Sequence, residues 1–344
     1  MPAACQPIRN FCGRRRHSHD YRVPGGRVVA PLELEADFRD DCRMQRFNSL
    51  VFAGVVLLLQ QAAPPTPLIR EGATVKVSDH VYVIPDGNVG GVPNVGIIVG
   101  SKATLVVDTG LGPRNGQTVL REVGKVSTNA DLYIVATHFH SEHTLGESAF
   151  PSSAKVFRAR AQQQDIDEFG VQPNFATRSA ANAELMKDAV FRRADEIFDT
   201  EKSIDLGGVR VRLLWYGGTH TNGDTLIFVE GDNVLFAGDV IMNRRFLAFN
   251  ARSSVQAWLR SLEVAARLRP ARIVPAHGEM GDGSLIEINR SYLQTLQNRV
   301  RELKREGRTV EQAAETLTGE FRSKYPDWTG NAGAAARSAY NEAN

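Results

Sequence analysis

Five of the eight histidines in this chain lie in three short motifs of a kind that binds metal ions. They are His138, His140, His143, His220 and His277. Imidazole is the commonest protein ligand for zinc, and histidines clustered with carboxylates indicate a metal site before any other function. The other three histidines, His17, His19 and His80, lie outside these motifs. The pattern therefore predicts a metal centre.

Each candidate ligand follows a short apolar segment that is typical of a strand. Residues 132–136 lead to His138, residues 211–214 to His220, residues 234–237 to Asp239, and residues 273–274 to His277. His138 and His140 are two residues apart at a strand end, so they point to the same side. A lone histidine is more often a structural residue, but four converging segments favour a site at one edge of the fold.

The remaining pattern predicts alternating strands and helices in two successive halves. Strands are expected at 74–84, 96–99, 103–107, 209–214, 225–229 and 272–274, and helices at 116–126, 254–268, 286–305 and 310–321. A glycine-rich turn, 86–91, could close over a site, the region 158–196 looks largely helical, and the alanine-rich tail from Asn331 is expected to fray. This order favours two sheets packed face to face with helices outside.

The composition excludes some classes of function. The 344 residues carry a formal net charge of +2 with both signs interspersed, so there is no basic stripe for a nucleic acid, and a small-molecule substrate is expected. All three cysteines precede residue 43, which leaves the body of the chain without a thiolate ligand or a disulfide. Nothing in the sequence predicts the oligomeric state.

The N-terminal region has the layout of a secretory signal peptide. An apolar run at 50–59 follows Met44-Gln45-Arg46 and precedes a Gln-Gln-Ala-Ala-Pro-Pro segment. We therefore expect translation to start at Met44, residues 1–43 to be a non-native or disordered leader, and 44–63 to be a signal peptide. The run is too short for a permanent membrane anchor, so the mature protein is expected to be periplasmic or secreted. The alternative is a buried core helix after a disordered leader.

Taken together, the motifs resemble those of the metallo-β-lactamase superfamily. The resemblance rests on His-x-His-x-acid-His at His138, Gly-x-His-Thr-x-Gly-Asp around His220, Phe-Ala-Gly-Asp ending at Asp239, and Pro-Ala-His-Gly at His277. It implies an α+β fold, a four-layer αββα sandwich. The expected catalytic domain covers 64–284, with C-terminal helices and a tail at 285–344 packed on it.

The resemblance also implies a role for each residue at a binuclear zinc centre. His138, His140 and His220 would hold the first ion, Glu142, His143 and His277 the second, and Asp239 would bridge them, while Asp108 would orient a ligand imidazole. The family usually has aspartate where this chain has Glu142. The longer side chain moves the carboxylate by about 1.5 Å, so either the loop adjusts or the second ion binds loosely, and Glu142 would then be a catalytic base.

The expected function is an exported zinc hydrolase in which a metal-bound hydroxide attacks the carbonyl of an ester, lactone, thioester or amide. Asp239 and Met242 stand where β-lactamases of the family generally have Cys or Ser and, in one subclass, Lys. Export nevertheless keeps β-lactam cleavage open as an alternative. Arg244 and Arg245 could bind an anionic substrate group, or could simply form a solvated surface pair.

Two further alternatives come from other classes of protein. One is a mononuclear iron oxidoreductase of the persulfide-dioxygenase kind, which uses part of the same ligand set. Retention of all five histidines and both carboxylates favours two metal ions instead. The other is a binding module without catalysis, which is expected if Glu142 has spoiled the second metal site.

Overall fold

The computed structural model describes residues 66–172, 176–245, 247–250, 252–328 and 332–343. The predicted leader (1–43) and signal peptide (44–63) lie outside these residues, so both stay predictions. The helices of the described residues include none that is both long enough and apolar enough to cross a membrane.

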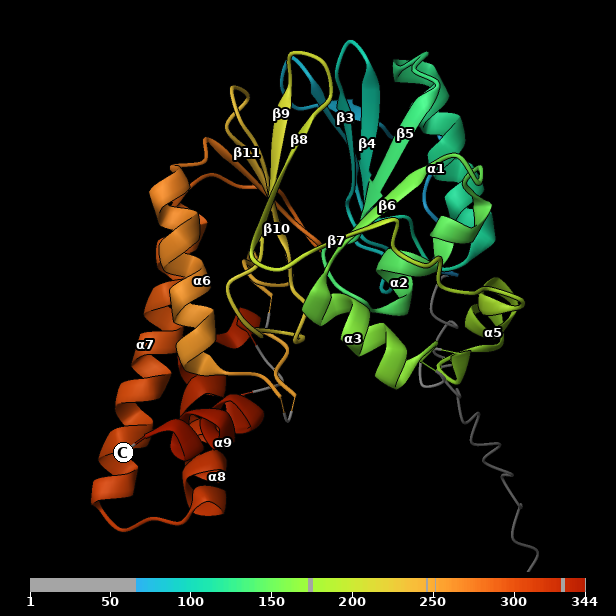
Figure 1. Cartoon of the computed structure of the whole chain (residues 1–344). Helices are drawn as coiled ribbons and strands as arrows, with labels where there is room; N and C mark the ends of the chain where they lie inside the picture. The colour runs from blue at the N-terminus through green and yellow to red at the C-terminus, as the bar shows by residue number, and fades with distance from the viewer. Residues whose placement is uncertain (1–65, 173–175, 246, 251, 329–331, 344) are drawn as a thin grey trace, which may run out of the picture. The chain divides into compact units, whose positions relative to one another are not determined.

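Two β-sheets form the centre of the described chain (Figure 1). The first sheet contains, in order, β1 (Val75–Lys76), β2 (Val81–Ile84), β3 (Val95–Val99), β4 (Ala103–Val107), β5 (Asp131–Val135), β6 (Lys155–Ala159) and β7 (Glu196–Phe198). The second contains β12 (Arg272–Pro275), β11 (Val234–Gly238), β10 (Leu226–Val229), β9 (Arg210–Leu214) and β8 (Glu201–Asp205).

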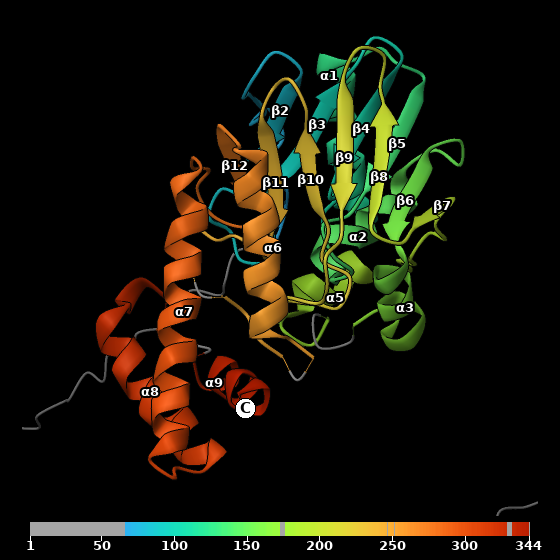
Figure 2. The ribbon, with the colours of Figure 1, turned by 60° about the vertical axis from the view of Figure 1, so that its left-hand side comes forward.

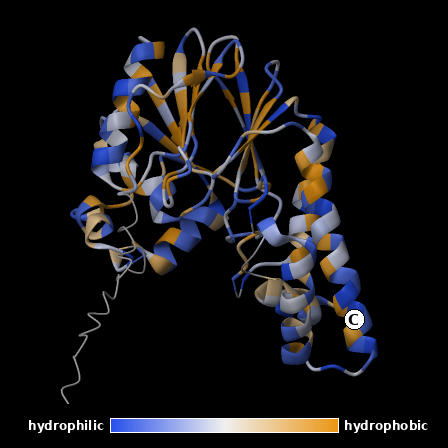
Figure 3. Ribbon diagram, turned by 180° about the vertical axis from the view of Figure 1, so that it is seen from behind, coloured by the Kyte–Doolittle hydropathy of each residue, from blue (hydrophilic) through white to orange (hydrophobic). Residues whose placement is uncertain are grey.

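Alternation of side chains along the strands divides the core into layers. Leu105 and Val107 of β4 face the second sheet and pack with residues such as Leu213 and Phe236, whereas Val106 between them points to the opposite face. The hydrophobic colour in Figure 3 accordingly gathers on the strands of both sheets. Because both faces of β10 and β11 are covered, every residue of these two strands is apolar and buried.

Helices cover the outer face of each sheet (Figure 2). Helix α1 (Pro113–Val126) packs Val119 and Val123 on the first sheet. The second sheet is covered by α6 (Val255–Leu268) and by the C-terminal helices α7 (Ser284–Arg305), α8 (Val310–Lys324) and α9 (Ala332–Glu342), with the short turn η2 (Pro326–Trp328). The predicted αββα sandwich with a helical C-terminal extension is confirmed.

Three local predictions were wrong. The segment 74–84 forms two strands, β1 and β2, because the chain turns at 77–80. The region 158–196 contains only two described helices longer than one turn, α3 (Arg160–Phe169) and α5 (Ala180–Met186), and it begins in β6. The tail from Asn331 does not fray, since α9 buries Ala335, Ala336 and Ala339 in the cluster formed by α6, α7 and α8.

Candidate metal centre

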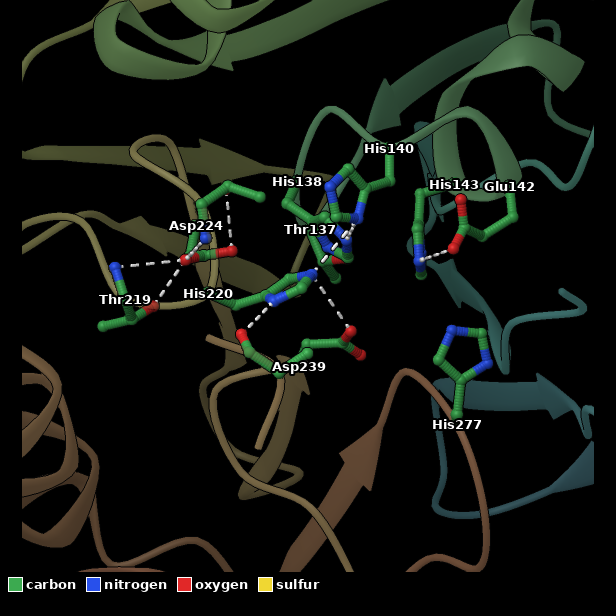
Figure 4. A network of polar contacts seen from close by, with 12 residues as sticks. Thr137, His138, His140, Glu142, His143, Thr219, His220, Asp224, Asp239 and His277 are labelled. Carbon is green, nitrogen blue, oxygen red and sulfur yellow. Dashed lines mark hydrogen bonds and ion pairs between the residues drawn. The ribbon is translucent and has the colours of Figure 1, made fainter. Parts of the chain in front are cut away.

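The candidate ligands come from segments that follow the strands, and Figure 4 shows their side chains gathered in one place. In the first sheet β4 and β5 run parallel with Val107 opposite Val135, so Asp108 and the loop that carries His138 leave the sheet together. In the second sheet β11 and β12 also run parallel, with Gly238 opposite Pro275. This register brings Asp239 and the loop of His277 to the same edge.

The first donor group consists of His138, His140 and His220, whose ring nitrogens converge. The Nδ1 atom of His140 lies 3.0 Å from Nε2 of His138 and 3.1 Å from Nε2 of His220. Three imidazole nitrogens that point at one small space are a known protein ligand set for a catalytic zinc ion. The structure thus brings these three predicted ligands together.

The His220 ring is fixed from its far side. Its Nδ1 atom lies 2.7 Å from the carbonyl oxygen of Ala248, so Nδ1–H donates there and the Nε2 lone pair faces the group. The loop that holds His220 closes on the buried Asp224, whose carboxylate accepts hydrogen bonds from the backbone N–H of Thr221 (2.6 Å) and from the hydroxyl of Thr219 (2.5 Å). Asp224 belongs to the predicted motif, but the sequence did not reveal this locking role.

The second donor group consists of Glu142, His143 and His277. Glu142 and His143 lie on the single-turn helix α2 (Ser141–Thr144), and a 3-10 turn, η1 (Leu145–Ala149), follows it. Oε1 of Glu142 lies 3.8 Å from Nε2 of His143. Glu142 therefore lies within the second group, and both sequence-based alternatives, an adjusted loop or a loosely bound second ion, stay predictions.

Buried polar atoms without hydrogen-bond partners show that the residues fit metal ions. Among the described residues, these atoms include Nε2 of His143, Oε2 of Glu142 and Oδ1 of Asp239. Leaving a buried polar atom unpaired costs about 1–3 kcal/mol, so each atom needs a compensating partner. Nitrogen and carboxylate oxygen atoms are the ligands that zinc accepts. That these side chains bind metal nevertheless stays a prediction.

Asp108 orients the second group through its carboxylate. Oδ2 lies 2.9 Å from Nδ1 of His143 and accepts the Thr137 hydroxyl at 3.0 Å, while Oδ1 accepts the Thr137 backbone N–H at 2.7 Å. The residue adopts a left-handed backbone conformation with φ of 61°, which aspartate tolerates better than most residues. The structure thus places Asp108 where the resemblance implied.

Asp239 lies beside both donor groups. Its Oδ2 atom is 3.4 Å from Nε2 of His220. Burial alone would raise the pKa of Asp239, but the imidazoles of His220, His277 and His143 outweigh burial and lower this pKa below its ordinary value. A carboxylate influenced by imidazoles of both groups suits the predicted bridging position.

Burial and neighbouring charges shift the pKa values of the other candidate ligands in different directions. Burial and the surrounding imidazoles lower the pKa of His138 and of His140 well below its usual range, so both rings stay neutral. Burial also opposes the charged form of His143, but the nearby Asp108 carboxylate outweighs it and raises the pKa of His143 to about 9. Burial raises the pKa of Glu142, which favours proton exchange there.

A clamp between two loops holds His277, and the sequence did not reveal it. Nδ1 of His277 lies 2.8 Å from the Val92 carbonyl oxygen. The buried Asn94 donates to the carbonyls of Pro275 (2.9 Å) and Gly278 (2.8 Å), and Asp86 accepts the Gly278 N–H at 2.8 Å. The turn at 86–91 is therefore tied to the His277 loop at its base. In the sequence, the only sign of this clamp was an acid and an amide residue, Asp86 and Asn94, at the two ends of a glycine-rich segment.

The predicted anion-binding arginines have different surroundings. Arg245 is half-buried, 3.7 Å from Asp86 and 3.2 Å from the side-chain oxygen of Asn88, so it braces the same clamp. Arg244 is exposed and has a φ of 52°.

Two other residues named in the sequence analysis lie away from the donor atoms. Met242 is buried, and its backbone N–H donates to the side-chain oxygen of Asn289. His80 pairs with Asp232, outside both donor groups.

Comparisons with known proteins agree with this geometry. A family model described as the metallo-beta-lactamase superfamily matches residues 88–277, which is more than half of the chain. A "Metallo-beta-lactamase type 2" of Elizabethkingia meningoseptica is 23% identical over 221 residues, 62% of this chain and 81% of that protein. A protein of the same name from Bacteroides fragilis is 28% identical, but the match spans only 26% of this chain and 38% of that protein.

Another curated relative has a different name. The "Acyl-coenzyme A thioesterase MBLAC2" of Gallus gallus is 22% identical, and the match covers 58% of this chain and 78% of that protein. Among solved structures, a metallo-beta-lactamase from Pontibacter korlensis has a TM-score of 0.53 at 19% identity, covering 64% of this chain and 98% of its own. An inverting sec-alkylsulfatase from Pseudomonas sp. has a TM-score of 0.60 at 15% identity, covering 78% and 50%. These structural likenesses show the fold.

Proposed function

We propose that this chain, which belongs to the metallo-beta-lactamase superfamily, is a zinc-dependent hydrolase that cleaves an ester, thioester, lactone or amide at its carbonyl carbon. One observation carries the proposal: two adjacent groups of three metal-ligand side chains, with Asp239 beside both. The names of the relatives, which include a β-lactamase and an acyl-CoA thioesterase, are compatible with attack on a carbonyl.

The residues around the donor groups have identifiable tasks in such a reaction. Bound divalent ions would supply a water-derived nucleophile at neutral pH and stabilise developing negative charge. Glu142 can hold or accept a proton at Oε2, which is buried and has no hydrogen-bond partner. Asp108 keeps His143 in one orientation through the hydrogen bond to Nδ1. Asp239 places a negative charge between imidazoles of both groups.

β-Lactam cleavage is an alternative that the assay below tests. The Met242 side chain is uncharged and buried, so it cannot bind the carboxylate of such a drug, and Arg245 already lies 3.7 Å from the carboxylate of Asp86. These contacts favour esters, thioesters and lactones. The relatives named as metallo-beta-lactamases are the reason to include a cephalosporin in the assay.

The first experiment uses zinc-loaded protein beginning at residue 64 and a panel of a chromogenic cephalosporin, aryl esters, a thioester and a lactone. His138→Ala removes one nitrogen of the first group, so turnover should fall at least about a thousandfold, as expected when a catalytic metal is lost. The matched control is His80→Ala, which alters a histidine outside both groups and should change nothing. Equal turnover in His138→Ala and the original protein would refute the assignment.

Metal analysis separates the proposal from the two other classes. About two zinc ions per chain are expected. About one iron ion per chain would instead favour the oxidoreductase alternative. Two zinc ions without turnover of any substrate in the panel would favour the binding module.

We also propose that the protein is exported, from the signal-like sequence at 44–63. Expression of the full chain in a Gram-negative host should release a protein that begins between residues 62 and 66 into the periplasm. Recovery of cytoplasmic protein that retains residues before Met44 would contradict this.

A further inference from the structure

A cavity of about 400 Å³ adjoins the first donor group on the side of α3. Its lining includes Phe139 and His140 from the histidine motif, Asp165 and Phe169 from α3, and Asn222 and Arg252 from the loops that follow β9 and β11. The volume is within the range of small-molecule sites. Because His140 is both a wall residue and a candidate ligand, a molecule in the cavity would extend directly to the metal centre.

An aromatic pair forms the apolar wall of this cavity. The Phe139 ring lies 5.0 Å from the His140 ring, and the Phe169 ring stacks on Phe139 with centroids 5.6 Å apart. Phe169 is 44% exposed and lines the cavity, so part of its ring is open to a molecule there. An apolar ligand group would gain by covering this surface.

The charged residues of the cavity do not offer a site for an anion. The guanidinium of Arg252 lies over the Phe169 ring at 4.7 Å, and both of its terminal nitrogens bind the carboxylate of Glu168. Its fork is therefore already satisfied by a carboxylate. Asp165 adds a buried acidic group that would repel an anionic ligand.

We propose that this cavity binds a neutral, apolar acyl group of the substrate and thereby selects acyl esters or thioesters with such a group. The inference rests on the proposed hydrolase function. The acyl chain lies against Phe139 and Phe169, and its carbonyl carbon is held at the edge where His140 meets the donor groups. An acyl chain that ends in a carboxylate is disfavoured, because Glu168 occupies Arg252 and Asp165 is acidic.

The first test is a series of p-nitrophenyl esters from acetate to hexanoate, with the glutarate half-ester as the charged member. We expect kcat/KM to rise by about tenfold or more from acetate to hexanoate. The kcat/KM of the glutarate half-ester should be lower than that of the hexanoate ester. Phe169→Ala should remove most of that rise, whereas Phe169→Leu, which keeps an apolar wall, should retain it. Val190→Ala, which alters an exposed residue outside the cavity, is the matched control.

A binding measurement separates this inference from the proposed function. Saturation-transfer NMR with hexanamide, and with acetamide as the short reference, should show binding of hexanamide that is lost in Phe169→Ala. Hexanamide binding without turnover of any ester would uphold the cavity assignment and count against the hydrolase. Turnover with a flat ester series, preference for the glutarate half-ester, or binding unaffected by Phe169→Ala would overturn the cavity assignment.

Discussion

At the scale of single residues, Glu142 distinguishes this site from the pattern usual in its family. Its carboxylate reaches the second donor group from a side chain that is one methylene longer than aspartate, and Oε1 lies 3.8 Å from Nε2 of His143. Oε2 is buried without a hydrogen-bond partner. Glu142 is therefore placed both to bind a metal ion and to hold a proton, and a substitution can separate these roles.

Replacing Glu142 with Gln keeps the size of the side chain and removes its charge. We expect zinc affinity at the second group to fall by at least about tenfold, the lower bound seen for residues that merely orient a ligand, while the first group keeps its ion. Zinc content measured against a chelator of graded strength would check this. The control is Glu315→Gln on the exposed face of α8. Loss of both ions together would contradict two separable groups.

At the scale of elements, the clamp on His277 links the turn after β2 to the loop after β12. Asn94→Ala removes hydrogen bonds to Pro275, Gly278 and the backbone of Asp86. We expect a loss of about 1–3 kcal/mol in the free energy of unfolding, together with weaker zinc binding at the second group. Denaturant unfolding of metal-free protein measures the first effect. A variant with unchanged stability and zinc content would show that the clamp does not position His277.

Helix α3 is tied to the His220 loop by Asp165, which accepts the backbone N–H of Gly223 at 3.0 Å. Only glycine fits at 223, because a Cβ atom there would lie 2.2 Å from the Cα atom of Gln162. Burial raises the pKa of Asp165 from its ordinary 3.8 to about 6. A raised carboxyl pKa means that ionising Asp165 costs more in the folded state than in the unfolded one. The neutral carboxyl group therefore contributes stability at low pH, and this contribution is lost as pH rises through 3.8 and about 6.

Asp165→Asn should therefore become more stable relative to the original protein as pH rises. The amide oxygen can still accept the Gly223 N–H, and the variant has no charge to bury. Urea unfolding at about pH 4.5 and about pH 7.5 would measure the change in the stability difference between the two proteins. Asp167→Asn, at an exposed position on the same helix, should show no such change. A pH-independent difference for Asp165→Asn would rule out the burial effect.

The strands that carry the site could be predicted because each is a buried apolar run that ends just before a ligand residue, as in 132–136 before His138. Strand β6 could not be predicted, because its Arg158 is of a type usual at the surface but is buried against Glu147. The edge strand β8 could not be predicted either, because its residues are mostly charged and largely exposed. The cavity beside His140 and the clamp on His277 depend on contacts between segments far apart in the chain, which short-range periodicity does not contain.

At the scale of the whole described chain, the C-terminal helices share one core with the second sheet. Leu235 of β11, Trp258 of α6 and Leu296 of α7 belong to the same buried cluster as Ala336 of α9. The sequence predicted helices at 286–305 and 310–321, which are α7 and α8, but the buried residues of α9 are all alanines. Alanine allows close approach of helices while giving little hydrophobic signal, which explains why the tail was expected to fray.

Because α9 is packed into this core, enlarging one of its buried alanines should destabilise the protein as a unit. Ala336 is fully buried, so Ala336→Leu forces extra methylenes into a filled space and should cost about 1–3 kcal/mol. Ala183→Leu, at an exposed position on α5, is the matched control and should cost less than about 0.5 kcal/mol. Calorimetry should show one cooperative transition with a lower Tm for Ala336→Leu. An unchanged Tm would mean that the C-terminal segment frays in solution. A second transition at a lower temperature than the main one would mean that α9 unfolds independently of the sheet whose strands precede Asp239 and His277.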